Sequence, residues 1–140
     1  MTQYMQNGLV SHPCIWGSGG ISSGHKFEIF TNLSLLPRGP GLYIMASVQH
    51  FGIRKALYIG QAEDVWVRYN DPKHDKFDRA VALGLSEIHV LGPITNKAER
   101  IRLETYLRHS ITPRPPLNEQ DLSGLAAYGP VNPLTQYGQF

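Results

Sequence analysis

The feature that most constrains the fold is a pair of apolar, strand-like runs on either side of a short turn. The first run covers Leu42 to Val48 and the second covers Ala56 to Ile59. Both are rich in residues that favour strands. The segment between them, QHFGIRK, contains Gly52, which is typical of a turn. The sequence therefore predicts an antiparallel hairpin with a longer loop, preceded by a strong turn signal over Pro37 to Gly41.

Two short helices are predicted after the hairpin. Asp64 is a suitable N-cap for a helix over Val65 to Tyr69. Asp71 and Pro72 have the residue types of a helix start, and Gly84 suits the end of the same helix.

A further strand and a longer helix are predicted next. Ser86 to Gly92 alternates polar and apolar residues as a strand does. The run TNKAERIRLETYLRHSI is the clearest helix, with Asn96 and Glu99 spaced as in a capping box and Pro113 disfavouring its continuation. The order is strand, strand, helix, helix, strand, helix. This order predicts a small α+β domain or mixed α/β sandwich with three strands.

The length of 140 residues fits one domain, and 41% hydrophobic residues are enough for a core. We divide the chain into an N-terminal arm and packing segment (1–36), a core (37–120) and a C-terminal tail (121–140). The first 24 residues are Gly- and Ser-rich and predict a loop or partly ordered arm. Lys26 to Leu36 predicts a short strand or helix that packs on the core.

The net charge and the cysteine content indicate which partners and which cellular compartment suit the protein. The formal net charge of +2 is a weak indication of a nucleic-acid partner. The single cysteine, Cys14, excludes an internal disulfide and a Cys-rich zinc cluster, and it fits a reducing, cytoplasmic setting. The N-terminus lacks the pattern of a secretory signal. We expect no membrane helix, because no run approaches about 20 apolar residues.

Tyr43 and Tyr58 stand in the two predicted hairpin strands, each close to a glycine that lets backbone or ligand approach. Half-buried packing is the common use of such tyrosines. Alternatively, both phenols face one pocket and orient a water or phosphate, or accept a proton. Arg68 can hold a phosphate through two hydrogen bonds or pair with Asp64 on the helix surface.

Glu104 is the most informative acid. Ile101 and Leu107 lie three residues on either side of it, so the carboxylate shares a helical stripe with apolar residues. A carboxylate beside a core needs a metal or a cation. The spacing leaves open whether Glu104 binds a metal or pairs with Arg100 or Arg108.

His74 and Asn118 are two further candidates. His74 lies near the start of the second predicted helix and is a general base, a phosphate contact or an ordinary helix-start histidine. Asn118 follows PRPP, a stiff extended run, and either fixes a loop or contacts a phosphate.

These residues, in this order, resemble the GIY-YIG nuclease family. GLY at 41–43 resembles the first signature, and YIG at 58–60 is the second. GQAEDVWVR resembles the Gly-x-Ala/Ser-x-Asn-Leu-x-x-Arg run of the family, with Asp64 where Asn is usual. ERIRLETYLRHSITPRPPLN resembles a later block in which a helical Glu precedes a Pro-containing turn that ends in Asn. The resemblance covers Leu36 to Asn118, although IMASVQHFGIRKAL is a little longer than usual between the signatures.

The resemblance implies a fold, an activity and roles for the candidates. The fold would be a small three-stranded antiparallel sheet flanked by helices, and the activity would be metal-dependent endonuclease cleavage of DNA. Glu104 would hold one divalent cation, Mg²⁺ or Mn²⁺, and Asn118 would brace the site or contact substrate. Tyr43 would be the base or would position the water, helped by His74 or Tyr58. The catalytic set would be Tyr43, Tyr58, Arg68, His74, Glu104 and Asn118.

Two other functions remain open at this point. One is a catalytically inactive nucleic-acid-binding module with the same fold, and the other is a purely structural α/β protein. A net charge of +2 gives little non-specific grip on DNA. DNA specificity would therefore come from loops, from residues 1–40, from a homodimer or from a partner protein.

Overall fold

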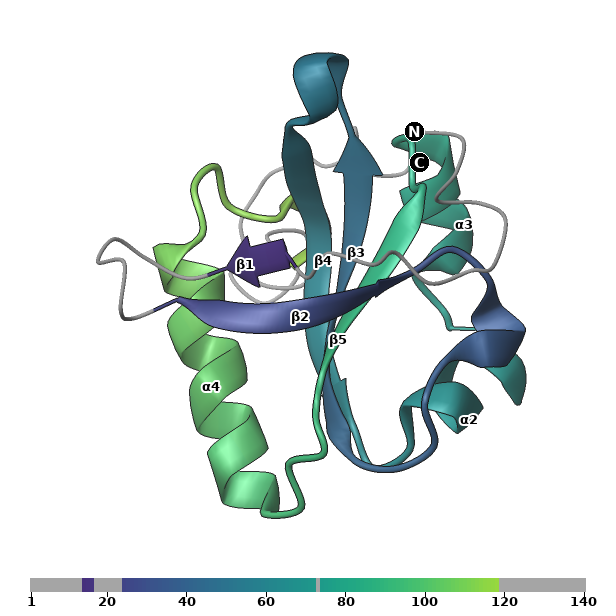
Figure 1. The fold of residues 1–140 in the computed structure, drawn as a ribbon, viewed down its shortest axis with the longest axis vertical. Coiled ribbons are helices and arrows are strands. Elements are labelled where there is room, and N and C mark those ends of the chain that lie inside the picture. Colours follow the sequence, from purple (N-terminus) through teal and green to yellow (C-terminus); the bar gives the residue numbers. More distant parts are fainter. Residues whose placement is uncertain (1–13, 17–23, 73, 119–140) are drawn as a thin grey trace, which may run out of the picture.

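The structure is a computed structural model that describes residues 14–16, 24–72 and 74–118. The predicted tail over residues 121–140 and most of the predicted arm lie outside these residues. Among the residues described, every helix is too short or too polar to cross a lipid bilayer. The elements are β1 (Cys14–Trp16), β2 (His25–Phe30), the 3-10 helix η2 (Leu33–Leu35), β3 (Gly41–Val48), the 3-10 helix η3 (His50–Gly52), β4 (Arg54–Ala62), α2 (Val65–Asn70), α3 (Phe77–Ala82), β5 (Glu87–Leu91) and α4 (Lys97–Ser110) (Figure 1).

The strands form one antiparallel sheet of five strands in the order β1-β2-β5-β3-β4. The prediction of a three-stranded sheet is therefore wrong. Residues 14–16, predicted as loop, pair with β2, and β2 pairs with β5, which lies about sixty residues later in the sequence. Such long-range pairing leaves no local pattern in the sequence. The expectation of a strand or helix packed on the core within Lys26 to Leu36 is confirmed by β2 and η2.

The predicted hairpin is confirmed by β3 and β4, whose pairing contains one irregularity. Met45 opposes Tyr58, but the next residue, Ala46, opposes Ala56, so Leu57 is the extra residue of a β-bulge. The bulge reverses the alternation of side chains along β4. As a result, Tyr58 packs on one face of the sheet and Ala56 on the other.

Alternation along β3, which lies between β5 and β4, supplies a core layer to each face of the sheet. Leu42 and Ile44 face the long helix α4, whereas Tyr43 and Met45 face the side of α2 and α3 (Figure 1). The layer under α4 contains Phe27, Leu42, Ile44, Ala56, Ile59, Leu103, Leu107 and Ile111. The opposite layer contains Phe30, Leu36, Tyr43, Met45, Leu57, Ala62, Val65, Tyr69, Ala80, Ile88, Val90 and Leu117.

The helix predicted to start at Asp71 and Pro72 is wrong at its beginning. Asp71 instead ends α2, donating its backbone N–H to the carbonyl oxygen of Val67 at 2.9 Å. The next helix begins only at Phe77. Between them, His74 is buried and accepts the backbone N–H of Lys76 on Nδ1, which makes a tight turn where a helical turn was expected.

The other predicted helix ends are confirmed. Asp64 caps α2 by accepting the backbone N–H of Val67 at 3.1 Å. Asn96 caps α4 by accepting the backbone N–H of Glu99 at 2.9 Å. Gly84 follows α3 with a φ of +98°, a conformation that glycine adopts readily at a helix C-terminus.

A buried chain of polar side chains crosses the sheet. Arg54 of β4 donates to the carboxylate of Glu87 in β5 at 2.7 Å, and His89 lies 2.7 Å from the same oxygen. Trp16 of β1 donates its indole N–H to Nδ1 of His89 at 2.8 Å. A neutral His89 therefore carries its proton on Nε2 and donates it to Glu87. The chain connects three strands of the sheet.

We predict that Glu87→Ala lowers the free energy of unfolding by about 3–5 kcal/mol, because Arg54 and His89 lose a buried acceptor. Chemical denaturation at pH 7 measures this loss. Burial raises the pKa of Glu87, but hydrogen bonds from His89 and Arg54 bring the net pKa below its usual value. Its contribution is thus present at neutral pH and disappears as pH falls through the folded-state pKa. Equal stability of variant and wild type at pH 7 would contradict the prediction.

Candidate active site

Three of the predicted site residues, Tyr43, Tyr58 and His74, pack against one another beside the hydroxyl group of Tyr43. Tyr43 lies in the inner strand β3, directly opposite Gly60 in β4. Its side chain is 1% exposed, and its Oη lies 2.7 Å from Nε2 of His74. The ring of Tyr58, diagonal to Tyr43 across the hairpin, is stacked at a centroid distance of 6.3 Å. Three of the six predicted residues are therefore in one cluster.

His74 lies at the centre of an aromatic cluster. Its ring centroid is 5.4 Å from those of Tyr43 and Tyr58 and 5.1 Å from that of Tyr69. Nδ1 accepts the backbone N–H of Lys76 at 2.9 Å. A neutral imidazole with an acceptor at Nδ1 carries its proton on Nε2. His74 therefore donates to the oxygen of Tyr43, and the hydroxyl proton of Tyr43 is directed elsewhere.

The surroundings keep both groups of this hydrogen bond neutral at pH 7. Burial, and then the charge of Arg68, lower the pKa of His74 to about 3. Burial and the neighbouring Tyr58 raise the pKa of Tyr43 far above its usual value, and Arg68 acts against this rise. Tyr43 is thus a phenol and His74 an uncharged imidazole.

Arg68 supplies the positive charge beside the aromatic cluster. It lies in the last turn of α2 and donates to Asp75 at 2.8 Å, with 36% of its side chain exposed. The predicted alternative of an Arg68–Asp64 pair is wrong, because Asp64 pairs with Arg38 at 3.0 Å. A half-exposed guanidinium next to a buried phenol can contact an incoming anion.

Glu104 of α4 makes the smallest contribution to the raised pKa of Tyr43, after burial and the neighbouring Tyr58. The predicted apolar stripe is only half correct: Leu107 is buried, but Ile101 is 45% exposed. The carboxylate lies 3.7 Å from the guanidinium of Arg108, and its side chain is 19% exposed. An ion pair is therefore present at the position where a metal ligand was the alternative.

Arg100, the other cation considered for Glu104, has different partners. It lies buried near the start of α4 and donates to the side-chain oxygen of Gln61 at 2.8 Å and to the carbonyl oxygens of Ile94 and Thr95. This arginine fixes the start of α4 against β4.

Asn118 braces the strand that carries Tyr58. Its amide oxygen accepts the backbone N–H of Ile59 at 2.7 Å, and its amide nitrogen donates to the Ile59 carbonyl oxygen at 2.9 Å. Because β4 is an edge strand, these bonds replace those that a neighbouring strand would make. Of the two predicted roles, the geometry is that of a brace.

Gly41 and Gly60, the glycines of the two tripeptides, are each required for a different steric reason. A Cβ on Gly60 would lie 2.5 Å from the hydroxyl oxygen of Tyr43. A Cβ on Gly41 would lie 2.7 Å from the carbonyl oxygen of Leu91 in the paired strand β5. Gly60 thus leaves room for the Tyr43 side chain, and Gly41 leaves room for the backbone of β5.

Glu104 is the predicted metal ligand, and its surroundings can be compared with the ligands that a divalent cation needs. Within the described ranges, no group of three His, Cys, Asp or Glu side chains is placed to hold a metal ion. A single carboxylate such as Glu104 is compatible with Mg²⁺, which keeps several waters and binds through one or two carboxylates together with phosphate oxygens.

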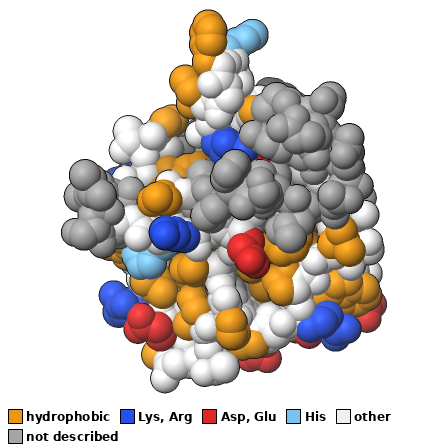
Figure 2. All heavy atoms as spheres, viewed as in Figure 1, with side chains coloured by type: hydrophobic (Ala, Val, Ile, Leu, Met, Phe, Trp, Pro, Cys, Tyr) orange, Lys and Arg blue, Asp and Glu red, His pale blue; other side chains and the backbone are white. Residues whose placement is uncertain are grey.

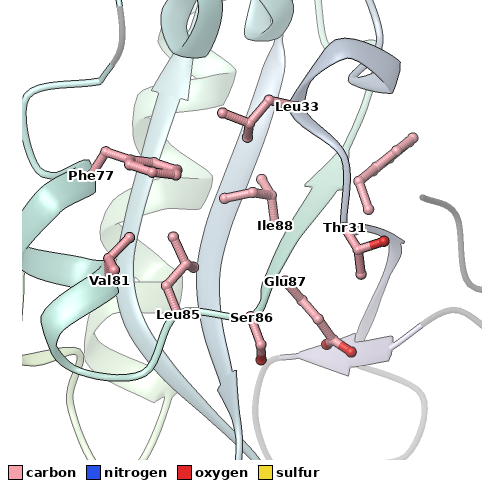
Figure 3. Close-up of a pocket in the computed structure, with 9 residues that line it drawn as sticks. Thr31, Leu33, Phe77, Val81, Leu85, Ser86, Glu87 and Ile88 are labelled. Carbon is pink, nitrogen blue, oxygen red and sulfur yellow. The ribbon is translucent and has the colours of Figure 1, made fainter. Parts of the chain in front are cut away.

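A separate apolar pocket of about 290 Å³ lies between α3, β5 and the end of β2. Phe77, Val81 and Leu85 line one side and face Leu33 and Ile88 (Figure 3). None of the six predicted site residues lines this pocket. It is distinct from the cluster around Tyr43.

Tyr69 is a member of the cluster that the sequence interpretation missed. Its ring packs edge-on against Tyr43 at 5.1 Å, and its buried hydroxyl has no hydrogen-bond partner among the described residues. It follows Arg68 in a short helix and lies four residues after Val65, which is the ordinary spacing of a core position. That spacing gave no sign of a role in the site.

Comparison with known proteins adds no identification, because no family model, no curated protein and no solved structure matches the chain.

We predict that Gly60→Ala costs about 1–3 kcal/mol of stability, because the new Cβ overlaps the Tyr43 hydroxyl. Urea unfolding measures the cost. In a Tyr43→Leu background the same substitution should cost less, because both Tyr43 atoms that approach the new Cβ, Oη at 2.5 Å and Cζ at 2.7 Å, are gone. Strictly additive costs in this double-mutant cycle would show that the overlap is not the cause.

We also predict an acid-dependent loss of stability that depends on His74. Its pKa rises from about 3 in the folded chain to 6.5 on unfolding, so the unfolded chain binds more protons between these values. Stability from this group is complete above pH 6.5 and falls by up to about 1.4 kcal/mol per pH unit as the solution is acidified. Urea unfolding from pH 7 to pH 4 should show a shallower slope for His74→Gln. His109→Gln, at an exposed position of α4, should keep the wild-type slope; identical slopes for all three proteins would refute the prediction.

Proposed function

We propose that the protein is a metal-dependent endonuclease of the GIY-YIG type that hydrolyses phosphodiester bonds in DNA. The observation that supports this most strongly is the packing of Tyr58 and His74 around one buried phenol, that of Tyr43. Arg68 lowers the pKa of this phenol and Glu104 raises it slightly. These are the residues that the resemblance assigns to catalysis.

In this proposal Tyr43 positions the attacking water. A neutral phenol at pH 7 is a poor base, but it can orient a water through its oxygen or its proton. The Nε2–H group of His74 fixes the Tyr43 oxygen, and Tyr58 flanks it. His74 is a positioning residue, because both of its ring nitrogens already have partners.

Arg68 and Glu104 would act on the phosphate. The guanidinium of Arg68 is partly exposed beside Tyr43 and can neutralise charge that develops on phosphoryl oxygens. A divalent cation held by Glu104 would supply Lewis-acid help to the phosphate and the leaving oxygen. Asn118 would keep Tyr58 in register by holding Ile59.

One observation favours the alternative of an inactive nucleic-acid-binding module. Arg108 lies 3.7 Å from Glu104 and provides a cation for this carboxylate. In an active protein, the Glu104 carboxylate would therefore have to leave Arg108 or bind both Arg108 and the metal.

A net charge of +2 gives weak non-specific binding to DNA. The proposal therefore includes a homodimer or a partner protein that supplies DNA specificity, in a cytoplasmic setting.

We predict that Glu104→Gln reduces Mg²⁺-dependent plasmid nicking by roughly 100-fold or more, because the amide cannot replace a charged metal ligand. Circular dichroism should show an unchanged fold. Glu99→Gln is the matched control, since Glu99 lies on the same helix and pairs with Arg102 at 2.6 Å. EDTA should abolish nicking by wild type and control alike. Normal nicking by Glu104→Gln would exclude this metal site, and no nicking by the wild type would favour the inactive module.

A further inference from the structure

The tip of the β3–β4 hairpin projects beyond the rest of the described chain (Figure 1). It consists of η3 and the residues beside it, Gln49 to Ile53. The side chain of Phe51 is 100% exposed and that of Ile53 is 63% exposed. Figure 2 shows hydrophobic and histidine side chains together at this protruding end. The tip lies within the segment that is longer than usual between the two Gly/Tyr tripeptides.

Phe51 has a backbone conformation that a bulky residue rarely adopts. Its φ is +62° and its ψ is +22°, and it is the single non-glycine residue with positive φ in the described part of the chain. Glycine or asparagine would suit this turn position better. The aromatic ring fills no core position either, since it is fully exposed. Neither the turn nor the core accounts for it, so strain here points to an external role.

Hydrogen bonds hold the tip in one conformation. The backbone N–H of Gln49 donates to Ile53 at 2.6 Å, that of Gly52 donates to Gln49 at 3.1 Å, and that of Ile53 donates to His50 at 3.3 Å. A ring displayed on a closed turn loses little conformational freedom when it binds a partner.

The charge of the hairpin identifies the chemistry of that partner. Residues 41–62 contain no Asp or Glu, and their charged side chains are Arg54 and Lys55. Arg54 is engaged with Glu87, whereas Lys55 is exposed at the base of the tip. An exposed aromatic ring on a positively charged protrusion suits a polyanion with stackable groups, which describes nucleic acid.

The hairpin also gives the distance from the tip to the candidate active site. Tyr58 follows Phe51 by seven residues on the same strand arm, which spans about 20 Å at the rise of a β-strand. In duplex DNA this corresponds to about six base pairs. One duplex can therefore contact the tip and the site together.

We propose that Phe51 is a wedge that inserts between stacked base pairs of duplex DNA, about six base pairs from the phosphate to be cleaved, with Lys55 on the backbone. The inference rests on the proposed function, because it names the contact by which the same protein holds its substrate. Insertion unstacks one step and unwinds the duplex there. This contact supplies binding affinity for DNA that the small net charge of the protein does not provide.

Two measurements in EDTA test the wedge without cleavage. Fluorescence anisotropy with a labelled 30-base-pair duplex gives affinity, and relaxation of a closed circular plasmid by a metal-independent topoisomerase reports unwinding. Phe51→Ala should weaken binding about 10-fold and abolish unwinding, because stacking of one ring is lost. Phe51→Trp should preserve both. Phe51→Gly should raise the melting temperature by relieving the positive φ, yet weaken binding as Phe51→Ala does.

Ile15→Ala is the matched control. Ile15 is 60% exposed on β1, at the opposite edge of the sheet from β4, and its loss should leave affinity and unwinding unchanged. Wild-type affinity and unwinding in Phe51→Ala would overturn the wedge. So would Phe51-dependent binding to phosphatidylserine vesicles with unchanged DNA binding, which would assign the tip to a membrane surface.

The two proposals fail in different ways. If the wild type binds and unwinds DNA through Phe51 but does not nick it with Mg²⁺, the nuclease proposal fails and the wedge stands. If Phe51→Ala nicks plasmid with wild-type concentration dependence, the wedge fails and the nuclease proposal stands. If both hold, Phe51→Ala should require about 10-fold more DNA for half-maximal nicking and should reach a similar maximal rate.

Discussion

The hydrogen bond between His74 and Tyr43 organises the side of the sheet on which the candidate active site lies. It joins β3 to the turn between α2 and α3, and the His74 ring closes that turn by accepting the backbone N–H of Lys76. Around this bond, the ring of Tyr58 packs edge-to-face against His74 and the ring of Tyr69 is stacked on it. The same burial that makes the packing dense keeps the imidazole uncharged. Packing and protonation in this layer are therefore two results of one arrangement.

The two faces of β3 carry different kinds of side chain. The face under α4 combines an apolar layer with buried His89 and Glu87, and the opposite face is rich in tyrosine and contains His74. The chain through Arg54, Glu87 and His89 adds a second polar connection, from the edge strand β4 to β5. The sheet is thus held together by two buried sets of polar contacts as well as by apolar packing.

The sequence was sufficient for features whose causes are local. The hairpin, the caps at Asp64 and Asn96 and the end at Gly84 all follow from neighbouring residues. It was insufficient where distant segments decide: β1 and β2 join the sheet through pairing with β5, and His74 leaves its expected helix because it contacts Tyr43. Tyr69 was missed for a related reason, since its helical spacing is equally that of a core residue.

The amide of Asn118 also affects how copies of this protein can associate. An edge strand normally presents unpaired N–H and C=O groups, to which another strand can add. At Ile59 both groups are already bonded to a side chain of the same molecule. A second copy therefore cannot extend the sheet continuously along β4 past this residue, and the middle of that edge, beside the tyrosines, stays closed to fibre-like growth.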